Sequence, residues 1–311
     1  MTLYDRGYRR YQDGFGSRAL RFGPIFVQGY QGAVRSKSFR RFAMLFLLIL
    51  IIHCMTYYLN PMAFFRRISG ADAGGGPSRV ETLRETVASF LGALEWLSPL
   101  LVLFVGSGLV AEDLRTRALP LYLVRPITPV DYWLGKWLVP AGVLAASFLL
   151  PTLFLVLFGV LLEPSDQVLD FASEQGPLVL GALAAYAAAA AAYGGLVLVV
   201  STLTGRRTPA LVLGAASIFI APVIVGLSVE ASRRGRDESV VASSGLLDAA
   251  KTLVLPNDVS SIFHAVSGAT IDNHERLILP PVGPAILMVG AIFLLGALVV
   301  IRRARTVEVV A

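Results

Sequence analysis

Few side chains in this chain of 311 residues could act as nucleophiles, bases or metal ligands. It has three histidines and a single cysteine, Cys54, so spacing assembles no zinc-type ligand set and no intramolecular disulfide can form. His53 and Ser107 are the one pair from which a serine hydrolase could start. They fall at different depths of two apolar stretches, and no G-x-S-x-G sequence surrounds the serine. We therefore expect no catalytic residue, no metal site and no enzymatic activity in the isolated chain.

The sequence also indicates whether the chain could draw energy from ATP or from an ion gradient by itself. Gly135-Lys136 lacks both the earlier glycine and the following Ser or Thr of a phosphate-binding loop, so we expect no nucleotide site here. Ion-coupled transporters depend on ionisable residues deep in the membrane. Here the one candidate, Glu95, falls near the outer end of its apolar stretch, where we expect it to reach water. Any work that this protein does would then need energy from a partner ATPase.

The elements that position these residues are apolar helices. The chain is 55% hydrophobic and only 15% charged, with a mean hydropathy of +0.69, which argues against a soluble enzyme. Six stretches are long enough to cross a bilayer, and Glu95 is the one Asp, Glu, Lys or Arg within them. We predict an all-α integral membrane protein whose six transmembrane helices cover residues 42–60, 90–110, 138–162, 177–203, 209–229 and 281–301.

The basic residues predict one orientation. Lys and Arg concentrate in residues 1–41, 111–137, 204–208 and 302–311, whereas the short loop 163–176 has four acidic residues and no basic one. Basic loops stay in the cytoplasm, so we predict that both termini are cytoplasmic and that loops 61–89, 163–176 and 230–280 lie outside. The first apolar stretch has no cleavage site of the signal-peptide type, and we expect it to remain as a span.

Two segments outside the spans have helical patterns. Residues 1–41 form a basic arm followed by an amphipathic stretch, which predicts a helix on the inner membrane surface or merely an orientation-setting flank; its basic residues include Arg35, Lys37 and Arg40. The arm has no nucleic-acid-binding pattern. In loop 230–280, Asn257 is a candidate cap for a helix that ends at Gly268. Such helices could lie on the outer leaflet or pack against the ends of the spans.

The most specific segment joins the second and third spans, as the cytoplasmic loop 111–137 of the transmembrane domain 42–311. A charged helical turn with Glu112, Asp113, Arg115 and Arg117 continues the second span, and Pro120 tends to end it. A turn at Arg125-Pro126 then leads to Gly135-Lys136, at the entrance to the third span. A charged projection fixed to two membrane helices could act as a lever, although it could also be a solvated loop that sets orientation.

This segment resembles the permease subunits of type-2 ABC transporters, such as those of the copper-centre maturation and gliding-motility kind. That family has a glutamate-rich turn after the second span, a leucine-rich segment ending in Pro-Ile or Pro-Leu, and Gly-Lys before the third span. The matching residues are Glu112, Leu119, Leu121, Leu123, Pro126, Ile127, Gly135 and Lys136. The departure is Arg117-Ala118, where the family usually has Gly-Thr. The six spans, the surface helix and the helical loop before the sixth span also resemble this family.

The resemblance implies a permease in the bacterial inner membrane that forms a dimer, a homodimer by expectation, and docks ATP-binding subunits from the cytoplasm. It further implies that residues 112–119 contact the ATPase, with Arg35, Lys37 and Arg40 as a second contact. ATP and magnesium would then bind the partner, and this chain would need no cofactor. The uncharged spans favour an apolar or amphipathic cargo and contact with membrane lipids. The alternatives are a non-transporting mechanotransmission or anchor subunit and an intramembrane enzyme dependent on Ser107.

Overall fold

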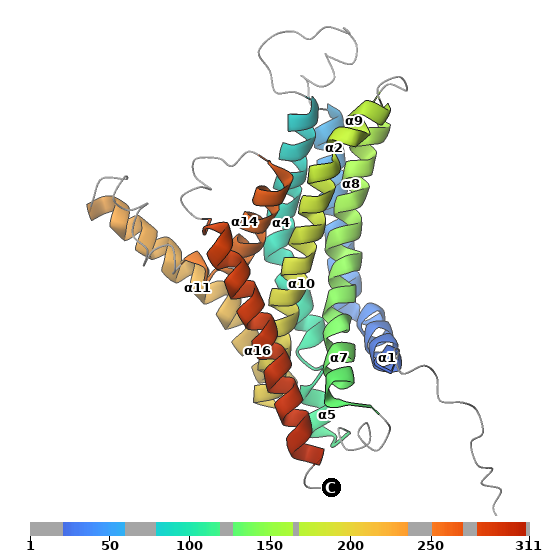
Figure 1. Ribbon diagram of the computed structural model, residues 1–311, viewed down its shortest axis with the longest axis vertical. Helices are drawn as coiled ribbons and strands as arrows, with labels where there is room; N and C mark the ends of the chain where they lie inside the picture. The colour runs from blue at the N-terminus through green and yellow to red at the C-terminus, as the bar shows by residue number, and fades with distance from the viewer. Residues whose placement is uncertain are drawn as a thin grey trace, which may run out of the picture.

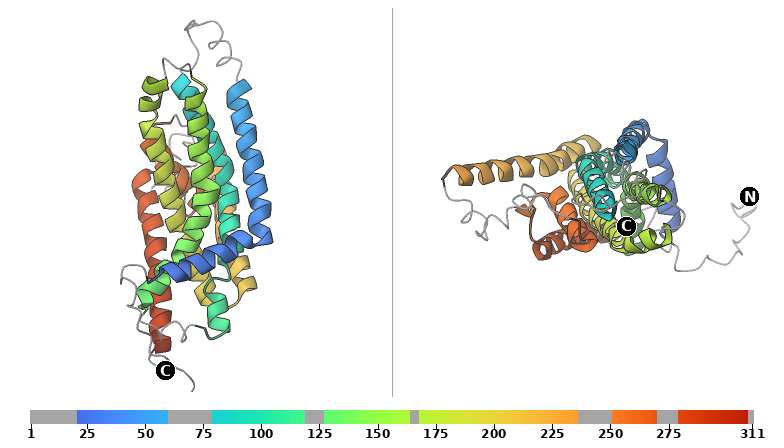
Figure 2. Two further views of the ribbon diagram at one scale, coloured as in Figure 1. Left: turned by 90° about the vertical axis from the view of Figure 1, so that its right-hand side faces the viewer. Right: turned by 90° about the horizontal axis from the view of Figure 1, so that it is seen from above.

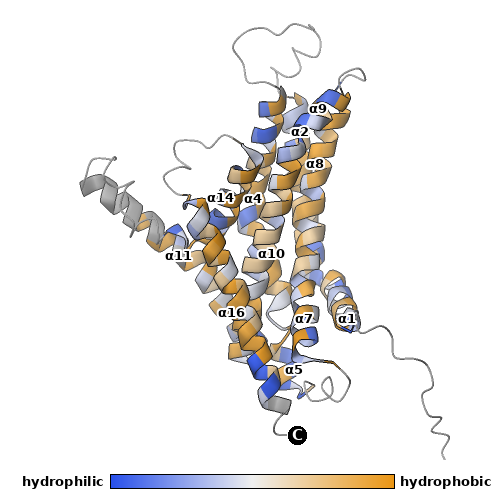
Figure 3. Cartoon of the chain, viewed as in Figure 1, coloured by the Kyte–Doolittle hydropathy of each residue, from blue (hydrophilic) through white to orange (hydrophobic). Residues whose placement is uncertain are grey.

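A computed structural model describes residues 21–59, 79–118, 127–163, 168–235, 251–269 and 279–308, and these parts of the chain are helical with short connections. The prediction of an all-α membrane protein is confirmed, because six helices are long and apolar enough to cross a membrane. Figure 1 shows them as an elongated bundle, and Figure 3 shows the apolar surface along α8 and α16. The helices are α1 Gly23–Arg35, α2 Lys37–Leu59, α4 Arg79–Gly106, α5 Ala111–Arg115, α7 Pro129–Leu144, the π-helix η3 Ala145–Leu149, α8 Leu150–Leu161, α9 Val168–Glu174, α10 Gly176–Thr204, α11 Arg207–Gly235, α14 Leu255–Ser267 and α16 Val282–Glu308.

The alanine-rich helix α10 lies at the centre of the bundle and packs against α4, α7, α11, α14 and α16. Gly195 faces α16 so closely that an added Cβ would lie 2.9 Å from the carbonyl oxygen of Ile292. Gly296 of α16 makes the reciprocal approach to the backbone of Gly195. Small residues let membrane helices come into backbone contact, so these two glycines allow α16 to pack directly against α10.

Helix α1 lies across the bundle near the end that carries α5, as the left view of Figure 2 shows. It ends at Arg35, although the basic residues assigned to the surface helix reach Arg40, because Ser36 adopts an extended conformation and its hydroxyl accepts a hydrogen bond from Phe39 N at 3.1 Å. A new helix therefore starts at Lys37. Of the three residues assigned to the surface helix, only Arg35 belongs to it. Lys37 and Arg40 lie in the first turns of α2, and that part of the assignment was wrong.

The predicted helix near residue 257 exists as α14, and it packs against α4, α10 and α16 rather than standing apart. The helix ends at Gly268, as predicted, and Gly268 adopts the left-handed conformation with φ of 66°. Val254, not Asn257, is the residue at its N-terminus, and Pro256 occupies the first turn. At the start of this loop, α11 continues as far as Gly235, and residues 236–250 fall outside the described residues.

Glu95 does not reach water as expected. The glycine-rich turn at residues 73–77 predicts a helix that starts near Ser78 and runs into the second span, and α4 does begin at Arg79, so Glu95 lies in the interior of this helix. The residue is only 6% exposed. The expectation rested on the place of Glu95 in its apolar stretch, which does not specify the helices that pack against α4, among them α2, α10 and α14.

Candidate functional site

A short helix, α5, stands at one end of the bundle, next to the connection between α10 and α11 (Figure 1). It is joined to α4 by the turn 107–110 and includes residues Ala111–Arg115. The predicted helical turn therefore exists, but it ends before Pro120. Leu119 and the following residues to Pro126, including Arg125, lie outside the described residues.

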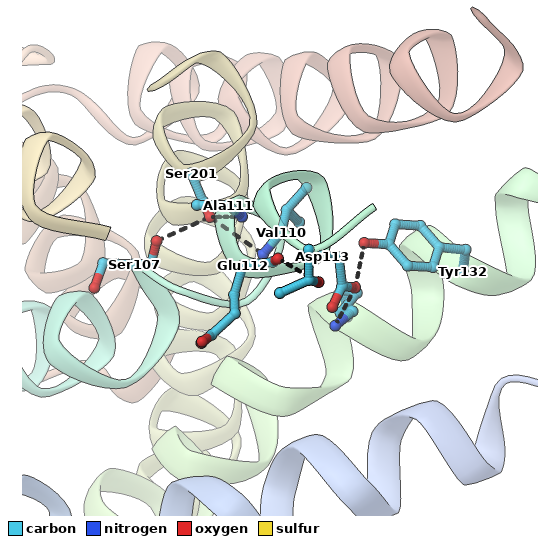
Figure 4. Close-up of polar contacts among 9 residues, drawn as sticks. Ser107, Val110, Ala111, Glu112, Asp113, Tyr132 and Ser201 are labelled. Atoms are coloured by element: carbon cyan, nitrogen blue, oxygen red, sulfur yellow. Dashed lines mark hydrogen bonds and ion pairs between the residues drawn. The ribbon is translucent and has the colours of Figure 1, made fainter. Parts of the chain in front are cut away.

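Ser201 of α10 holds the start of α5 in place, as Figure 4 shows. Its hydroxyl oxygen accepts hydrogen bonds from Val110 N at 3.2 Å and Ala111 N at 2.9 Å. The same hydroxyl donates to the carbonyl oxygen of Ser107 at 3.0 Å. The first amides of a helix have no partner within it, and here a neighbouring membrane helix supplies that partner. All of these contacts are buried, so α5 is fixed to α10 at its N-terminus.

Asp113 fixes the other side of α5 to α7. Its carboxylate forms an ion pair with Lys136 Nζ at 2.7 Å and accepts a hydrogen bond from the Tyr132 hydroxyl at 2.8 Å. The exposed fractions of the side chains are 14% for Asp113 and 9% for Lys136. The Lys136 ammonium also lies 5.6 Å from the centre of the Tyr132 ring. This largely buried cluster connects the short helix to the entrance of the third span.

Glu112 and Arg115 point away from the bundle. They form an ion pair at 3.6 Å, and their side chains are 63% and 68% exposed. Residues three apart share one face of a helix, whereas Asp113 is turned by about 100° from Glu112. Arg117, also exposed, ends the segment with φ of 53°, in the left-handed region that favours glycine. Adjacent residues of α5 thus divide into an inward anchor and an outward charged face.

Gly135 has a packing role in the same region. An added Cβ at Gly135 would lie 2.9 Å from Ile25 Cβ and 3.1 Å from the carbonyl oxygen of Phe22. A glycine at this position therefore lets α1 cross α7 in close contact. Gly135 and Lys136 therefore make two different contacts. Gly135 packs against α1, and Lys136 forms an ion pair with Asp113 of α5.

Two hollows flank α5. A cavity of about 260 Å³ lies among α1, α4, α5, α7 and α11, with Asp113, Lys136 and Arg207 in its walls. A larger hollow of about 670 Å³ lies between α5 and the start of α11, and its lining includes Glu112, Arg115, Arg206 and Arg207. The Arg207 guanidinium also donates to the carbonyl oxygen of Phe104 at 3.2 Å. The outward face of α5 therefore borders a concave surface that carries charges of both signs.

The structure brings together six of the predicted residues, which are Glu112, Asp113, Arg115, Arg117, Gly135 and Lys136. Sequence reasoning missed Tyr132, Ser201 and Arg207. The spacing of Tyr132 and Lys136, four residues apart on one helix face, could have indicated the first of them. Ser201 is the one serine of α10, and nothing in its local sequence relates it to the start of α5.

His53 and Ser107 do not meet in this structure. The His53 ring packs against Phe90 with ring centres 5.3 Å apart, and its Nδ1 lies 2.8 Å from the carbonyl oxygen of Ile49. Phe90 and Gly106 are at opposite ends of a helical stretch of about 24 Å at 1.5 Å per residue. Ser107 follows Gly106 and therefore lies far from the histidine. The geometry offers no nucleophile and base at these two residues.

Neither a scan against protein-family models nor a search of the curated proteins finds a match to this chain.

Proposed function

We propose that this chain is the membrane-spanning permease subunit of an ATP-binding-cassette transporter of the type-2 kind, and that α5 is its contact with a partner ATPase. This proposal rests on the two faces of α5, one bound to neighbouring helices and the other exposed. Its inward side is tied to α7 and α10 by buried polar contacts, while Glu112 and Arg115 remain exposed. A force applied to the exposed face would pass into two membrane helices without first deforming a flexible loop.

The backbone at Arg117 supports the same proposal. The family that the sequence resembles usually has glycine here, and the arginine in this chain adopts a left-handed conformation with φ of 53°. For a residue other than glycine, this backbone conformation costs roughly 1–2 kcal/mol of conformational free energy. Arg117 therefore keeps the backbone turn that a glycine would make at this position, although its own backbone is strained.

The chain offers an ATPase a surface of mixed charge rather than an apolar one. Glu112, Arg115 and Arg206 line the larger hollow beside α5. Exposed charges at such an interface set partner choice and the rate of encounter more than affinity. ATP and magnesium would bind the partner, and this chain would transmit the conformational change.

Orientation and assembly belong to the same proposal. The α5 end of the bundle, with the C-terminal end of α16, would face the cytoplasm of a bacterium, and two copies of the chain would form the transport unit. The basic residues Arg35, Lys37 and Arg40 lie toward this end, as part of α1 and of the first turns of α2. The apolar spans favour an apolar or amphipathic substrate, moved between the copies.

Co-purification tests the docking role. The tagged wild-type chain, extracted from its native membrane, should retain an ATP-binding-cassette subunit and hydrolyse ATP. Replacing Glu112 and Arg115 together by Gln should release that subunit. The matched control replaces one exposed acid and one exposed base elsewhere, Glu85→Gln with Arg305→Gln, and should retain it. Equal retention by both double variants, or no such subunit with the wild type, would overturn the assignment.

A labelling experiment tests the orientation separately. Cys54 is the chain's one cysteine, so a Cys54→Ala background makes single-cysteine variants simple to interpret. Arg115→Cys should react with a membrane-impermeant maleimide only after the cells are opened, because residue 115 is exposed on the α5 side. Ser173→Cys in α9, toward the opposite end, should react in intact cells. The reverse pattern would place α5 outside and end the proposal.

A further inference from the structure

A third hollow lies at the same end of the bundle, between α10 and α16, away from α5. Its volume is about 370 Å³. Its lining residues are Thr202 and Leu203 of α10 and Leu298, Val299, Arg302, Arg303 and Thr306 of α16. Leu203 is 71% exposed and Leu298 is 45% exposed, so the hollow opens onto the apolar surface of the bundle.

The lining changes from apolar to cationic along one face of α16. Leu298, Arg302 and Thr306 follow one another at four-residue steps, and Val299 and Arg303 form the neighbouring row. Each step is about 6 Å along the helix axis. The candidate span that contains them ends at Thr306, so the two arginines lie in its last turns. The hollow is therefore apolar on the membrane side and positively charged where lipid headgroups lie.

The charge of the hollow is positive and unopposed. Its lining contains no Asp or Glu, and neither arginine forms an ion pair with any residue that the structure describes. Both arginines are exposed rather than folded against the bundle. The C-terminal ends of α10 and α16 contribute a partial negative charge of roughly half a unit each, which two full guanidinium charges exceed. The site therefore still favours an anion.

We propose that this hollow binds one anionic glycerophospholipid. The guanidinium groups of Arg302 and Arg303 would hold the headgroup phosphate, with the planar, bidentate geometry that arginine offers to phosphate. One acyl chain would lie against Leu203, Leu298 and Val299. A free phosphate ion would use only the cationic half, and the exposed apolar half is what favours a lipid. Basic hollows between membrane helices are known to take acidic headgroups in this way. This inference does not depend on the proposed transport function.

Native mass spectrometry of the full-length chain in detergent measures the binding directly. Phosphatidylglycerol, added in steps, should give one bound lipid at low concentration, and phosphatidylcholine should bind more weakly. Replacing Arg302 and Arg303 together by Gln should weaken phosphatidylglycerol binding roughly thirtyfold, because each basic residue near the membrane surface contributes about 1 kcal/mol of attraction to an anionic lipid. The matched control, Arg206→Gln with Arg305→Gln, removes the same charge from two exposed arginines outside the lining and should bind as the wild type does.

A third variant tests the apolar half without changing charge. Leu203→Trp should fill the hollow and lower phosphatidylglycerol binding, and the high exposure of Leu203 means that the fold should tolerate the change. Equal binding by the two double-arginine variants would overturn the assignment. So would competition by millimolar inorganic phosphate, since that result would indicate a phosphate site and not a lipid site. Equal affinity for phosphatidylcholine would likewise exclude selection of an anionic headgroup.

Discussion

The ion pair between Asp113 and Lys136 gives the sharpest test of how α5 is held. Asp113→Asn keeps the shape of the side chain but removes its charge, which leaves the Lys136 ammonium largely buried beside a neutral amide. Removing one partner of a buried pair typically costs 3–5 kcal/mol. Because both side chains retain some exposure, at 14% and 9%, we expect the loss in the free energy of unfolding to lie at the lower end of this range, about 3 kcal/mol.

Thermal unfolding in detergent, followed by tryptophan fluorescence, measures this loss. With roughly 2 °C per kcal/mol for a chain of this size, Asp113→Asn should lower Tm by about 6 °C. Removing both charges, in Asp113→Asn with Lys136→Met, should be less damaging than the sum of the single changes, since no uncompensated charge remains.

Glu112 supplies the matched control, because it is the adjacent acid and its ion pair with Arg115 is exposed. Exposed pairs contribute about 0–1 kcal/mol, so Glu112→Gln should stay within roughly 2 °C of the wild type. The same variant should weaken ATPase retention if Glu112 faces the partner. A Tm for Asp113→Asn no lower than that of Glu112→Gln would refute the division of α5 into an inward anchor and an outward face.

Three further outcomes follow from the structure. Arg117→Gly should be at least as stable as the wild type in thermal unfolding, whereas Arg117→Val should lose about 1 kcal/mol, because a β-branched residue fits the left-handed region poorly. Gly135→Ala should destabilise the α1 contact by about 1–3 kcal/mol through overpacking, while Gly32→Ala, with open space around its Cβ, should be neutral or slightly stabilising. Burial raises the pKa of Asp258 to about 8, so the folded state binds a proton that the unfolded state releases near pH 4. Stability should therefore fall as the pH rises from about 4 to 8, and Asp258→Asn should flatten that slope in Tm measured against pH.

The membrane helices could be predicted because the bilayer imposes one strong requirement on sequence, about 20 apolar residues in a row. All six spans were found in that way. Their ends were less certain, since a helix can continue into water without any change in hydropathy. That is why α4 starts at Arg79 and α7 at Pro129, earlier than the apolar stretches do. Glu95 was misplaced because its burial depends on the helices that pack against α4, which its own stretch of sequence does not specify.

The outward charges of the candidate site could also be predicted, because Glu112 and Arg115 lie in one short charged turn. Their inward counterparts could not. The Asp113 carboxylate meets Lys136 only because α7 packs beside α5, and Ser201 approaches the turn from about 90 residues further along the chain. Such pairings depend on which helices become neighbours, and no local pattern in a single sequence specifies that.

The anchored side of α5 also limits how a docked partner could act. Asp113 ties it to α7, Ser201 ties it to α10, and Gly135 seats α1 on the same stretch of α7. A displacement of α5 would therefore reach three helices together, and α10 would pass it to α16 through the close backbone contact at Gly195. Packed helices move as rigid elements more readily than they deform. A partner that pushes on Glu112 and Arg115 should shift this group of helices as a unit.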